Sequence, residues 1–408
     1  SGMLCDIFTG TTNVAQYFKQ RNFSIVSNDI NRCCYPLQMS YISNNSFPKF
    51  DKLLKKIGEQ KSKFNYEEIE DMKNYILKKI KKDKIFPEGY IDELNFLENI
   101  TPLIKVLIYL NNLPMDNLRK EELFFYNYYT KFGNKSKYES SRGTVGKRNY
   151  FNEYNAKKIG QILNKLKKWY LRKNLINKYE FNILLTSLIE EVNLVANVNG
   201  TFHDFNRKKL YPNAKVNMKL KPIKLNITPV SSKTYKVFCE DSNKLGKRKT
   251  LKDLYPIDIL YIDPPYNFRQ YSDYYHLINL IAKFHEIEDL EDYGDSLKYV
   301  RGQNMKDSIK SDYCYKDKFK DALKDLIKSI DAKHIILSYY DENNHWNHGK
   351  NEISYKGRKV IKNIFREMND IKSFDKEPYK IDRQNYQSRN GHKKKIVDEL
   401  LFYAKKRR

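Results

Sequence analysis

The sequence predicts an α/β fold in which a mostly parallel, Rossmann-like sheet is interrupted by a large helical insertion. Two observations lead to this prediction. A strand, a turn, a helix and a second strand open the chain, and alternating strand and helix patterns return in its second half. Such alternation is typical of a parallel sheet covered by helices. We therefore expect a core formed by residues 1–46 and 223–408, and an insertion formed by residues 47–222.

The beginning of the chain has the pattern of a nucleotide-binding βαβ unit. Residues 3–8 predict a short buried strand, residues 9–12 a turn, and the apolar residues that follow recur at helical spacing. Residues 23–27 predict the second strand. Folds of this type bind ribose hydroxyls through an acidic residue at the end of that strand. Asp29 has this position here.

The predicted insertion, residues 47–222, has long lysine-rich helical patterns and little strand signal. One of its helices has a core face, because apolar residues follow the i, i+3, i+4, i+7 spacing at Ile159, Ile162, Leu163 and Leu166. The neighbouring lysines fall largely on other faces of that helix, at Lys157, Lys158, Lys165 and Lys168. A solvated face explains these lysines more simply than contacts with phosphate.

The charge of the chain favours a polyanionic partner. Lys+Arg 76 against Asp+Glu 50 gives a net charge of +26, and nucleic acid is the first candidate for such a balance. The alternative is a lysine-rich proteome in which many surfaces are basic. Residues 131–148 indicate a mobile basic loop that either becomes ordered on DNA or serves as a linker. Its candidate DNA-binding residues are Lys135, Lys137, Arg142, Lys147 and Arg148.

The cysteines and the apolar runs indicate an intracellular protein. There are five cysteines, an odd number, and none has C-x-x-C spacing, so we expect neither a disulfide framework nor a metal site. No apolar run is long enough to span a bilayer, and no leader precedes the first strand. We therefore expect a soluble protein without a membrane partner in the cytoplasm, bacterial or nucleoid-associated.

Strand patterns return after residue 222. Residues 235–239, 257–262 and 334–339 predict strands, and residues 395–403 predict an edge strand. Helical stretches are expected near residues 274–284 and 319–330. This alternation again predicts a mostly parallel sheet.

The turn after residues 257–262 has a specific chemical use. The strand is β-branched and apolar, and two prolines end it, so Asp263, Pro264, Pro265 and Tyr266 lie in a stiff turn at its carboxyl end. Open α/β sheets bind ligands at that end. Asp263 and the Pro264 carbonyl can each accept one hydrogen of an exocyclic amine, which makes the nitrogen lone pair available. Tyr266 can stack on the base. A solvated carboxylate in a plain Pro-Pro turn is the alternative.

Residues 6–12, Asp-Ile-Phe-Thr-Gly-Thr-Thr, and residues 263–266 together resemble the motifs of adenine-N6 DNA methyltransferases that use S-adenosylmethionine. The chain is similar in particular to the D12-class, FokI-methylase-like branch, and the similarity extends to residues 267–276, 196–200 and 336–339. The resemblance implies a class I methyltransferase core with the cofactor motif first, a target-recognition insertion second and the catalytic motif last. Catalytic roles then fall on Asp263, Pro264, Pro265 and Tyr266.

The resemblance also implies a cofactor site for S-adenosylmethionine, formed by Asp6, Phe8, Gly10, Thr11, Asp29 and Asp241. Asp6 would meet the amino group of the cofactor, and the Gly10 turn would let the backbone approach its methionine end. Asp29 would bind the ribose hydroxyls. Asp241 would accept from the adenine amine, with Glu240 as the alternative. Phe8 covers part of the cofactor or belongs to the core.

The implied substrate is double-stranded DNA with the target adenine flipped out of the stack, where Tyr266 would stack on it. Arg269 and Tyr271 follow closely and are expected to contact DNA or to support the base pocket. Four residues near the C-terminus are expected at the pocket wall or in the DNA groove, namely Tyr379, Arg383, Tyr386 and Arg389. Cytosine-N4 enzymes of the class more often have Ser at the position of Asp263, so Asp favours adenine.

The sequence departs from the family pattern in two places. Thr12 stands where the class has Gly, so a side chain is expected to enter the cofactor loop. The family also has a cofactor-covering segment ahead of the first strand, which begins here at about Met3. We therefore expect weak binding of S-adenosylmethionine by this chain unless another segment supplies the cover.

We therefore expect the chain to methylate adenine N6 at a specific short sequence in DNA. It would be the modification component of a restriction-modification system, with a cognate restriction endonuclease as a further partner. Two alternatives remain. The chain is a truncated or regulatory homologue that binds DNA without catalysis, or it methylates adenine in RNA.

Overall fold

The structure is a computed structural model that describes residues 2–59, 64–82, 93–228, 232–254, 256–297, 299–340, 344–346, 356–384 and 396–407. The chain divides into two compact units. Unit 1 contains Ser1–Gln38, Val230–Tyr274 and Ser308–Arg408, and unit 2 contains Met39–Pro229 and Tyr275–Asp307.

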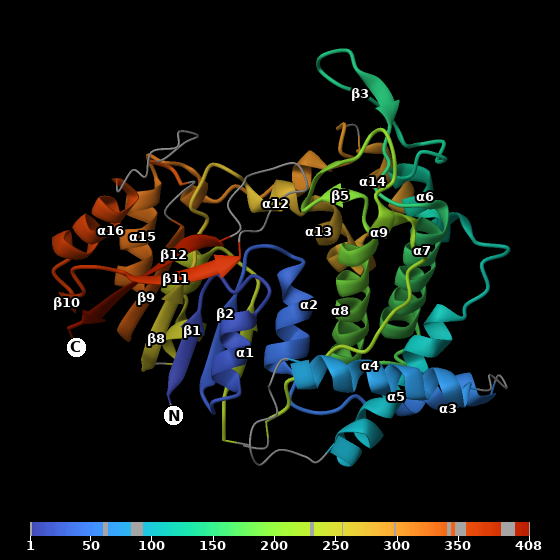
Figure 1. The fold of residues 1–408 in the computed structure, drawn as a ribbon, viewed down its shortest axis with the longest axis horizontal. Helices are drawn as coiled ribbons and strands as arrows, with labels where there is room; N and C mark the ends of the chain where they lie inside the picture. The colour runs from blue at the N-terminus through green and yellow to red at the C-terminus, as the bar shows by residue number, and fades with distance from the viewer. Residues whose placement is uncertain are drawn as a thin grey trace. The chain divides into compact units, whose positions relative to one another are not determined.

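Unit 1 is an α/β domain with a mixed, mostly parallel sheet, which confirms the predicted fold class (Figure 1). The strand order is β10-β12-β9-β8-β1-β2-β7, and β11 also pairs with β12. The parallel strands are β1 (Met3–Asp6), β2 (Ser24–Asn28), β7 (Tyr235–Phe238), β8 (Ile257–Ile262) and β9 (Ala332–Tyr340). The antiparallel strands are β10 (Ile371–Phe374), β11 (Tyr379–Gln384) and β12 (Ile396–Lys406).

The core of unit 1 lies between one face of this sheet and helices that follow its strands. Apolar residues of the central strands, such as Leu260 and Ile335, pack in one buried cluster with Leu245, Phe319 and Ile361 from three helices. The larger helices of the unit are α1 (Asn13–Lys19), α10 (Ser242–Lys247), α15 (Phe319–Ser329) and α16 (Lys356–Glu367), with short helices α2 (Cys34–Gln38), α11 (Lys249–Lys252) and α12 (Tyr271–Tyr274) and the 3-10 turn η6 (Asp312–Cys314). The predicted strands at residues 235–239, 257–262 and 334–339 correspond to β7, β8 and β9, which belong to the parallel part of the sheet together with β1 and β2.

The expectation of an edge strand at residues 395–403 is wrong. β12 pairs with β9 on one side from Glu399 to Lys405 and with β11 on the other from Ile396 to Leu401. Its last residues pair with β10. Eleven residues are enough to form ladders along both edges, so this strand lies inside the sheet.

Unit 2 is mainly helical. Its helices are α3 (Asp51–Glu59), α4 (Tyr66–Lys82), α5 (Glu93–Asn111), α6 (Phe124–Tyr129), α7 (Glu153–Lys167), α8 (Lys178–Val195), α9 (Pro212–Lys215), α13 (His276–Lys283) and α14 (Leu290–Asp295), with η1 (Met39–Ser43), η2 (Lys120–Leu123), η3 (Lys168–Arg172), η4 (Phe284–Glu286) and η5 (Met305–Asp307). Two hairpins join them, β3 (Lys137–Glu139) with β4 (Val145–Lys147), and β5 (Val198–Asn199) with β6 (Thr201–Phe205). The unit differs from the predicted segment 47–222, because residues 275–307 pack with it.

Local sequence explains the two long central helices of unit 2. Asn152 caps α7 by accepting the backbone N–H of Asn155 at 2.7 Å. At the start of α8, Asn177 accepts the N–H of Glu180 and the Glu180 carboxylate accepts the N–H of Asn177, which is a capping box. These caps satisfy N–H groups that a helix cannot satisfy by itself.

The solvated-face interpretation is wrong for one lysine of α7. Lys158 is 1% exposed, and its ammonium group donates to the carbonyls of Asn111 at 3.1 Å and Leu113 at 2.9 Å, just past the end of α5. Burial lowers the pKa of Lys158 to about 8. A cation at a helix C-terminus offsets the negative end of its dipole, so this lysine stabilises the packing of α5 against α7.

The described residues contain no helix that is long and apolar enough to cross a membrane. The five cysteines are free thiols. Within the same ranges, no group of three or more His, Cys, Asp or Glu side chains is arranged to hold a metal ion.

Candidate active site

Three carboxylates gather at one edge of the unit 1 sheet. β1 lies between β2 and β8 and runs parallel to both, with Asp6 opposite Ser27 and Tyr261 (Figure 1). Asp6 therefore ends β1 where Asp29 follows β2 and Asp263 follows β8. The carboxyl ends of parallel strands are the ligand-binding edge of open α/β sheets.

Asp6 is a buried carboxylate with a raised pKa. It is 1% exposed, and its Oδ2 accepts the Thr9 hydroxyl at 3.0 Å. Its Oδ1 is buried without a hydrogen-bond partner among the described residues. Burial, with a smaller contribution from the charges of Asp263 and Asp29, raises the pKa of Asp6 to about 7. A buried unpaired oxygen is costly unless a ligand donates to it.

Asp29 shapes the loop that follows β1. Its Oδ2 accepts the backbone N–H of Gly10 at 2.9 Å, and its Oδ1 accepts the backbone and side-chain N–H groups of Asn31. Gly10 has φ +50, and a Cβ atom built on it would meet nothing within 4 Å. Because Gly10 has no side chain and no atom lies near its Cα on that side, a ligand has space to approach the backbone of the turn.

Thr12 is accommodated without filling that loop. It has φ 69, an uncommon conformation for a β-branched residue, and its side chain is fully buried. Its hydroxyl donates to the Thr11 carbonyl at 2.6 Å and accepts from the Gln16 amide at 2.9 Å. The side chain is thus bonded to the start of α1.

Asn28 joins the ends of three strands and was missed by the sequence analysis. Its amide group donates to the carbonyls of Ile7 at 3.1 Å and Glu240 at 3.0 Å, and its Oδ1 accepts the N–H of Glu240. It is 1% exposed. The sequence signal that could have identified it was an asparagine at the end of the strand, directly before Asp29.

Asp241 and Glu240 have different surroundings. Asp241 caps α10 by accepting the N–H of Lys244 at 2.9 Å, and it lines a cavity of about 520 Å³ together with Tyr313. Glu240 is instead ion-paired with Arg248 at 2.9 Å. Asp6, Gly10 and Asp29 do not line this cavity, so the choice of Asp241 over Glu240 as the cofactor ligand stays a prediction.

The turn after β8 packs against β9. Pro264 is buried, while Asp263, Pro265 and Tyr266 are partly exposed. The Tyr266 ring lies 5.3 Å from that of Tyr340. Its backbone carbonyl accepts the N–H of His345 at 3.0 Å. These contacts hold both the Tyr266 ring and the backbone of the turn, in which Asp263 is partly exposed.

The residues present fit S-adenosylmethionine. The unpaired oxygen of Asp6 suits an ammonium group, the open turn at Gly10 lets a ligand approach the backbone, and Asp29 can accept hydroxyls. Phe8 is partly buried against the core of unit 1, and its ring meets that of Tyr313 edge-on at 4.9 Å. Tyr313 is a second residue that the sequence analysis missed.

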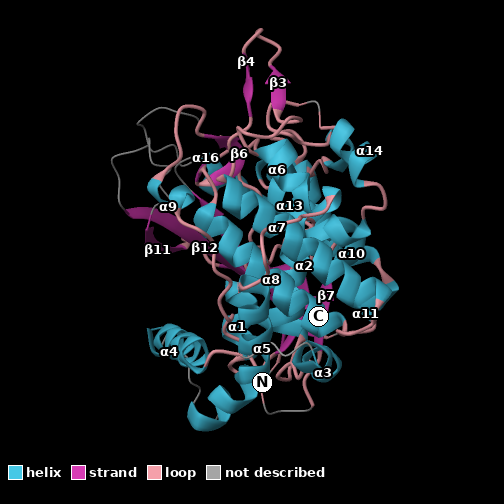
Figure 2. Cartoon of the chain, turned by 90° about the vertical axis from the view of Figure 1, so that its right-hand side faces the viewer, coloured by secondary structure: helices cyan, strands magenta, loops and turns pink. Residues whose placement is uncertain are grey.

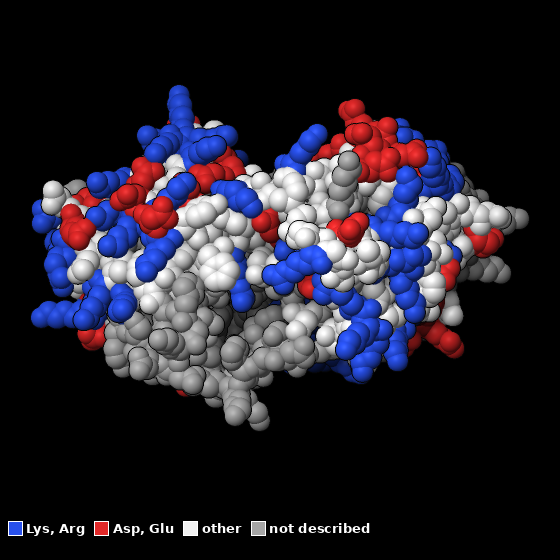
Figure 3. All heavy atoms as spheres, turned by 90° about the horizontal axis from the view of Figure 1, so that it is seen from above, with Lys and Arg blue, Asp and Glu red and all other residues white. Residues whose placement is uncertain are grey.

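The segment predicted as a mobile basic loop is in large part a hairpin, β3 and β4, which extends beyond α6 and α7 of its unit (Figure 2). Lys137, Arg142 and Lys147 are exposed on it. Lys135 is also exposed, but its ammonium group lies 3.1 Å from the Asp295 carboxylate. On the face shown in Figure 3, basic side chains are spread widely and alternate with acidic ones.

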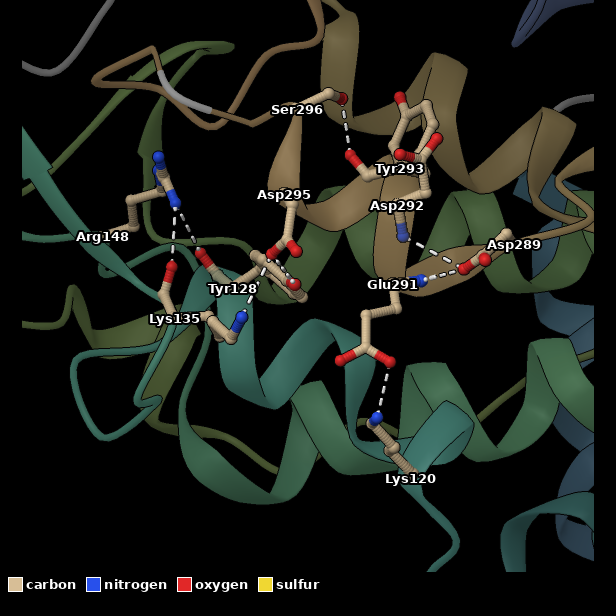
Figure 4. A network of polar contacts seen from close by, with 10 residues as sticks. All are labelled: Lys120, Tyr128, Lys135, Arg148, Asp289, Glu291, Asp292, Tyr293, Asp295 and Ser296. Atoms are coloured by element: carbon tan, nitrogen blue, oxygen red, sulfur yellow. Dashed lines mark hydrogen bonds and ion pairs between the residues drawn. The ribbon is translucent and has the colours of Figure 1, made fainter.

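The expectation that Arg148 contacts DNA is wrong. Arg148 is 1% exposed, and its guanidinium donates to five backbone carbonyls, those of Tyr128, Lys135, Leu297, Tyr299 and Val300, at 2.5 to 3.4 Å. Figure 4 shows two of these bonds beside the ion pairs Lys135–Asp295 and Lys120–Glu291. Five donors and full burial make Arg148 a structural residue of unit 2.

The segment 196–200, which contributed to the resemblance, also has a structural role. Asn197 is fully buried, and its amide group donates to the carbonyls of Asn149, Asn206 and Lys209. Its Oδ1 accepts the N–H of Tyr211. This residue holds the β5–β6 hairpin against the start of α7.

The remaining expected contact residues lie in unit 1. Arg269 is exposed, and its guanidinium lies 5.5 Å from the centre of the Tyr274 ring. Tyr271 begins α12 and is partly exposed. Tyr379 is 64% exposed on β11. The Arg383 side chain, Tyr386 and Arg389 lie outside the described residues.

The mostly parallel sheet with its helices has the architecture of a class I methyltransferase core. Residues 1–341 match the family described as D12 class N6 adenine-specific DNA methyltransferases, and the chain belongs to this family. Methyltransferases of this family use S-adenosylmethionine as the methyl donor.

Two relatives match nearly the whole chain. The modification methylase StsI of Streptococcus sanguinis is 29% identical over 406 residues, covering 98% of this chain and 47% of the relative. The type II methyltransferase M.FokI of Planomicrobium okeanokoites is 28% identical over 403 residues, covering 98% and 48%. The type II methyltransferase M.NlaIII of Neisseria lactamica is 26% identical over 343 residues, covering 83% and 75%. The chain thus spans about half the length of the first two. No solved structure matches it significantly.

Proposed function

We propose that this chain transfers the methyl group of S-adenosylmethionine to N6 of an adenine in double-stranded DNA. The observation that carries the proposal is the position of Asp6 and Asp263 at the ends of neighbouring parallel strands, close enough that the charge of Asp263 helps to raise the pKa of Asp6. One carboxylate can hold the cofactor and the other can hold the acceptor amine. Family membership supports the same assignment.

The proposed cofactor residues are Asp6, Phe8, Gly10, Thr11, Asp29 and Asp241. Asp6 pairs with the ammonium group, and the open backbone of the turn at Gly10 and Thr11 lies along the methionine end. Asp29 accepts the ribose hydroxyls, and Asp241 accepts the adenine amine. When bound, S-adenosylmethionine supplies a methyl group on a positively charged sulfur.

The proposed catalytic turn acts on the acceptor. Asp263 and the Pro264 carbonyl accept the two amine hydrogens, so the nitrogen lone pair becomes available. Pro265 keeps the turn rigid. Tyr266 stacks on the flipped adenine and recovers part of the few kcal/mol that unstacking costs.

For DNA binding we propose that unit 2 recognises the target through the β3–β4 hairpin. Lys137, Arg142 and Lys147 are exposed there and can neutralise phosphates. Lys135 can also contribute, after exchanging Asp295 for a phosphate. Arg269 and Tyr271 are proposed to contact the strand near the flipped base.

A role as the modification component of a restriction-modification system, with a cognate endonuclease, is proposed from two relatives, StsI, which is named as a modification methylase, and M.FokI, which is named as a type II methyltransferase. The compartment would be the one that holds the DNA, the bacterial cytoplasm. Because the chain spans about half of these relatives, the activity of a longer protein is part of the proposal.

The test is a transfer assay with methyl-labelled S-adenosylmethionine and mixed duplex DNA, followed by mapping of the modified adenines. A parallel reaction with structured RNA decides the RNA alternative. Transfer to duplex DNA alone is expected. DNA binding without transfer by a chain that binds S-adenosylmethionine would instead support the regulatory homologue.

A further inference from the structure

His345 contacts two loops of unit 1. One is the catalytic turn, residues 263–266, and the other is residues 312–314, which pack against residues 7–10, called here the cofactor turn. Its backbone N–H donates to the Tyr266 carbonyl at 3.0 Å. Its ring Nε2 lies 2.8 Å from the Tyr313 carbonyl. A carbonyl can only accept, so Nε2 carries the hydrogen in this bond. The backbone and the ring of one residue therefore hold two different loops.

The second of these loops continues to the cofactor turn. The Tyr313 hydroxyl donates to Asn243 Oδ1 at 2.8 Å and to the Ala322 carbonyl at 3.1 Å. Its ring meets Phe8 edge-on, with ring centres 4.9 Å apart. Phe8 lies between Asp6 and Gly10 in the sequence. A displacement of Tyr313 would therefore be transmitted directly to the cofactor turn.

The surroundings of His345 leave it no direct role toward substrate. It is 2% exposed, and its ring packs against those of Phe319 at 5.5 Å and Trp346 at 5.6 Å. The preceding Asn344 is fully buried, donates to the Tyr340 carbonyl and accepts the N–H of Trp346. The ring is thus held by its bond to the Tyr313 carbonyl and by apolar contacts, in a segment that Asn344 fixes with two hydrogen bonds.

We propose that His345 is a positioning residue, which sets the separation between the turn that holds the acceptor amine and the turn that holds the cofactor. This proposal rests on the methyl-transfer function proposed above. Displacement reactions need the reacting atoms about 3 to 3.5 Å apart, and a misplacement of about 1 Å costs about 10²-fold in rate. A residue that bridges the two turns can therefore affect turnover without touching either ligand.

Two conservative variants test the ring bond, because each keeps the backbone N–H. In His345→Gln the amide nitrogen can take the position of Nε2, whereas in His345→Asn the side chain is too short to reach the Tyr313 carbonyl. We expect His345→Gln to keep kcat within about threefold and His345→Asn to lower it about tenfold or more. His345→Asn should also weaken S-adenosylmethionine binding several-fold by calorimetric titration, with an unchanged KM for DNA.

His334 provides the matched control. It lies on β9, the strand that precedes His345, and its Nδ1 is 2.8 Å from the Tyr403 hydroxyl on β12, a contact within the sheet. His334→Asn makes the same substitution at a histidine that does not contact Tyr266 or Tyr313, and it should leave kcat and cofactor affinity unchanged.

A readout independent of activity is amide hydrogen exchange in the cofactor-free protein. Exchange in residues 7–10 and 312–314 should accelerate in His345→Asn and not in His345→Gln or His334→Asn. If the Gln and Asn variants behave alike in exchange, affinity and kcat, the proposal is overturned. An inactive wild type would count against the proposed function, while the exchange comparison would still decide the role of His345.

Discussion

The carboxylate of Asp29 accepts the backbone N–H of Gly10 at 2.9 Å, although 19 residues separate them. This bond fixes the turn after β1 with a residue that is also expected to bind the ribose of the cofactor. The turn and the ribose site are therefore built on one side chain. A substitution of Asp29 should alter both the turn and the ribose site. The roles of single carboxylates are therefore tested better by substitutions of Asp6 and Asp263.

Asp6→Asn should change how stability depends on pH. Because the pKa of Asp6 is raised from 3.8 to about 7, its stabilising contribution is complete below about pH 4 and is lost as the pH rises through about 7. At about 1.4 kcal/mol for each pKa unit, the loss is at most about 4.5 kcal/mol. Denaturant unfolding of the cofactor-free proteins at pH 5 and 8 should show a steeper loss in the wild type. Parallel curves for the two proteins would contradict the assignment.

Asp263→Ala should lower methyl transfer by about 10²-fold or more, by analogy with the loss of one oxyanion-hole donor. S-adenosylmethionine affinity should stay within a few-fold, because this carboxylate acts on the amine. Asp258→Ala is the control, since Asp258 lies at the other end of β8 and accepts the N–H of Met3 at 2.8 Å. Near-normal turnover in Asp263→Ala would exclude the proposed role.

Replacing Lys137, Arg142 and Lys147 together by Ala should weaken DNA binding and flatten its salt dependence. Each phosphate contact contributes a slope of about −0.9 in log K against log salt, so three lost contacts should reduce the slope by about 2.7. Affinity measured between 50 and 200 mM salt, concentrations at which such effects are large, provides the check. An unchanged slope would show that these cations belong to a solvated surface.

Arg148→Met should destabilise unit 2 instead of weakening DNA contact directly. Five carbonyls would lose their donor, and each buried acceptor that is left unsatisfied typically costs about 1 to 3 kcal/mol. Arg148→Lys should be intermediate, because an ammonium group has three donors. Chemical denaturation measures the effect, and wild-type stability in both variants would refute it.

Thr12→Gly should leave S-adenosylmethionine affinity within about threefold. The Thr12 side chain is bonded to Thr11 and Gln16 and does not occupy the space beside Gly10. The free energy of unfolding should also change little. Relief of the positive φ stabilises the variant by about 1 to 2 kcal/mol, and the loss of the two Thr12 hydrogen bonds costs about 1 kcal/mol each. Tenfold tighter binding in calorimetry would mean that the threonine obstructs the cofactor after all.

The amino-acid sequence by itself determined the parallel core and the location of the candidate site. Apolar periodicity marked β1, β2, β7, β8 and β9, and the Asp-Pro-Pro-Tyr turn marked the strand end that matters, because both signals are local. In a parallel sheet, the ends of such strands then necessarily share one edge.

Tertiary structure alone decided which distant segments meet. It placed β12 inside the sheet, joined residues 275–307 to the helical unit, buried Arg148 among carbonyls and brought His345 to Tyr266 and Tyr313. These outcomes depend on hydrogen bonds and packing between residues far apart in the chain, and local periodicity contains no information about such partners. An arginine in a basic segment therefore has the same sequence signal whether it faces DNA or five backbone carbonyls.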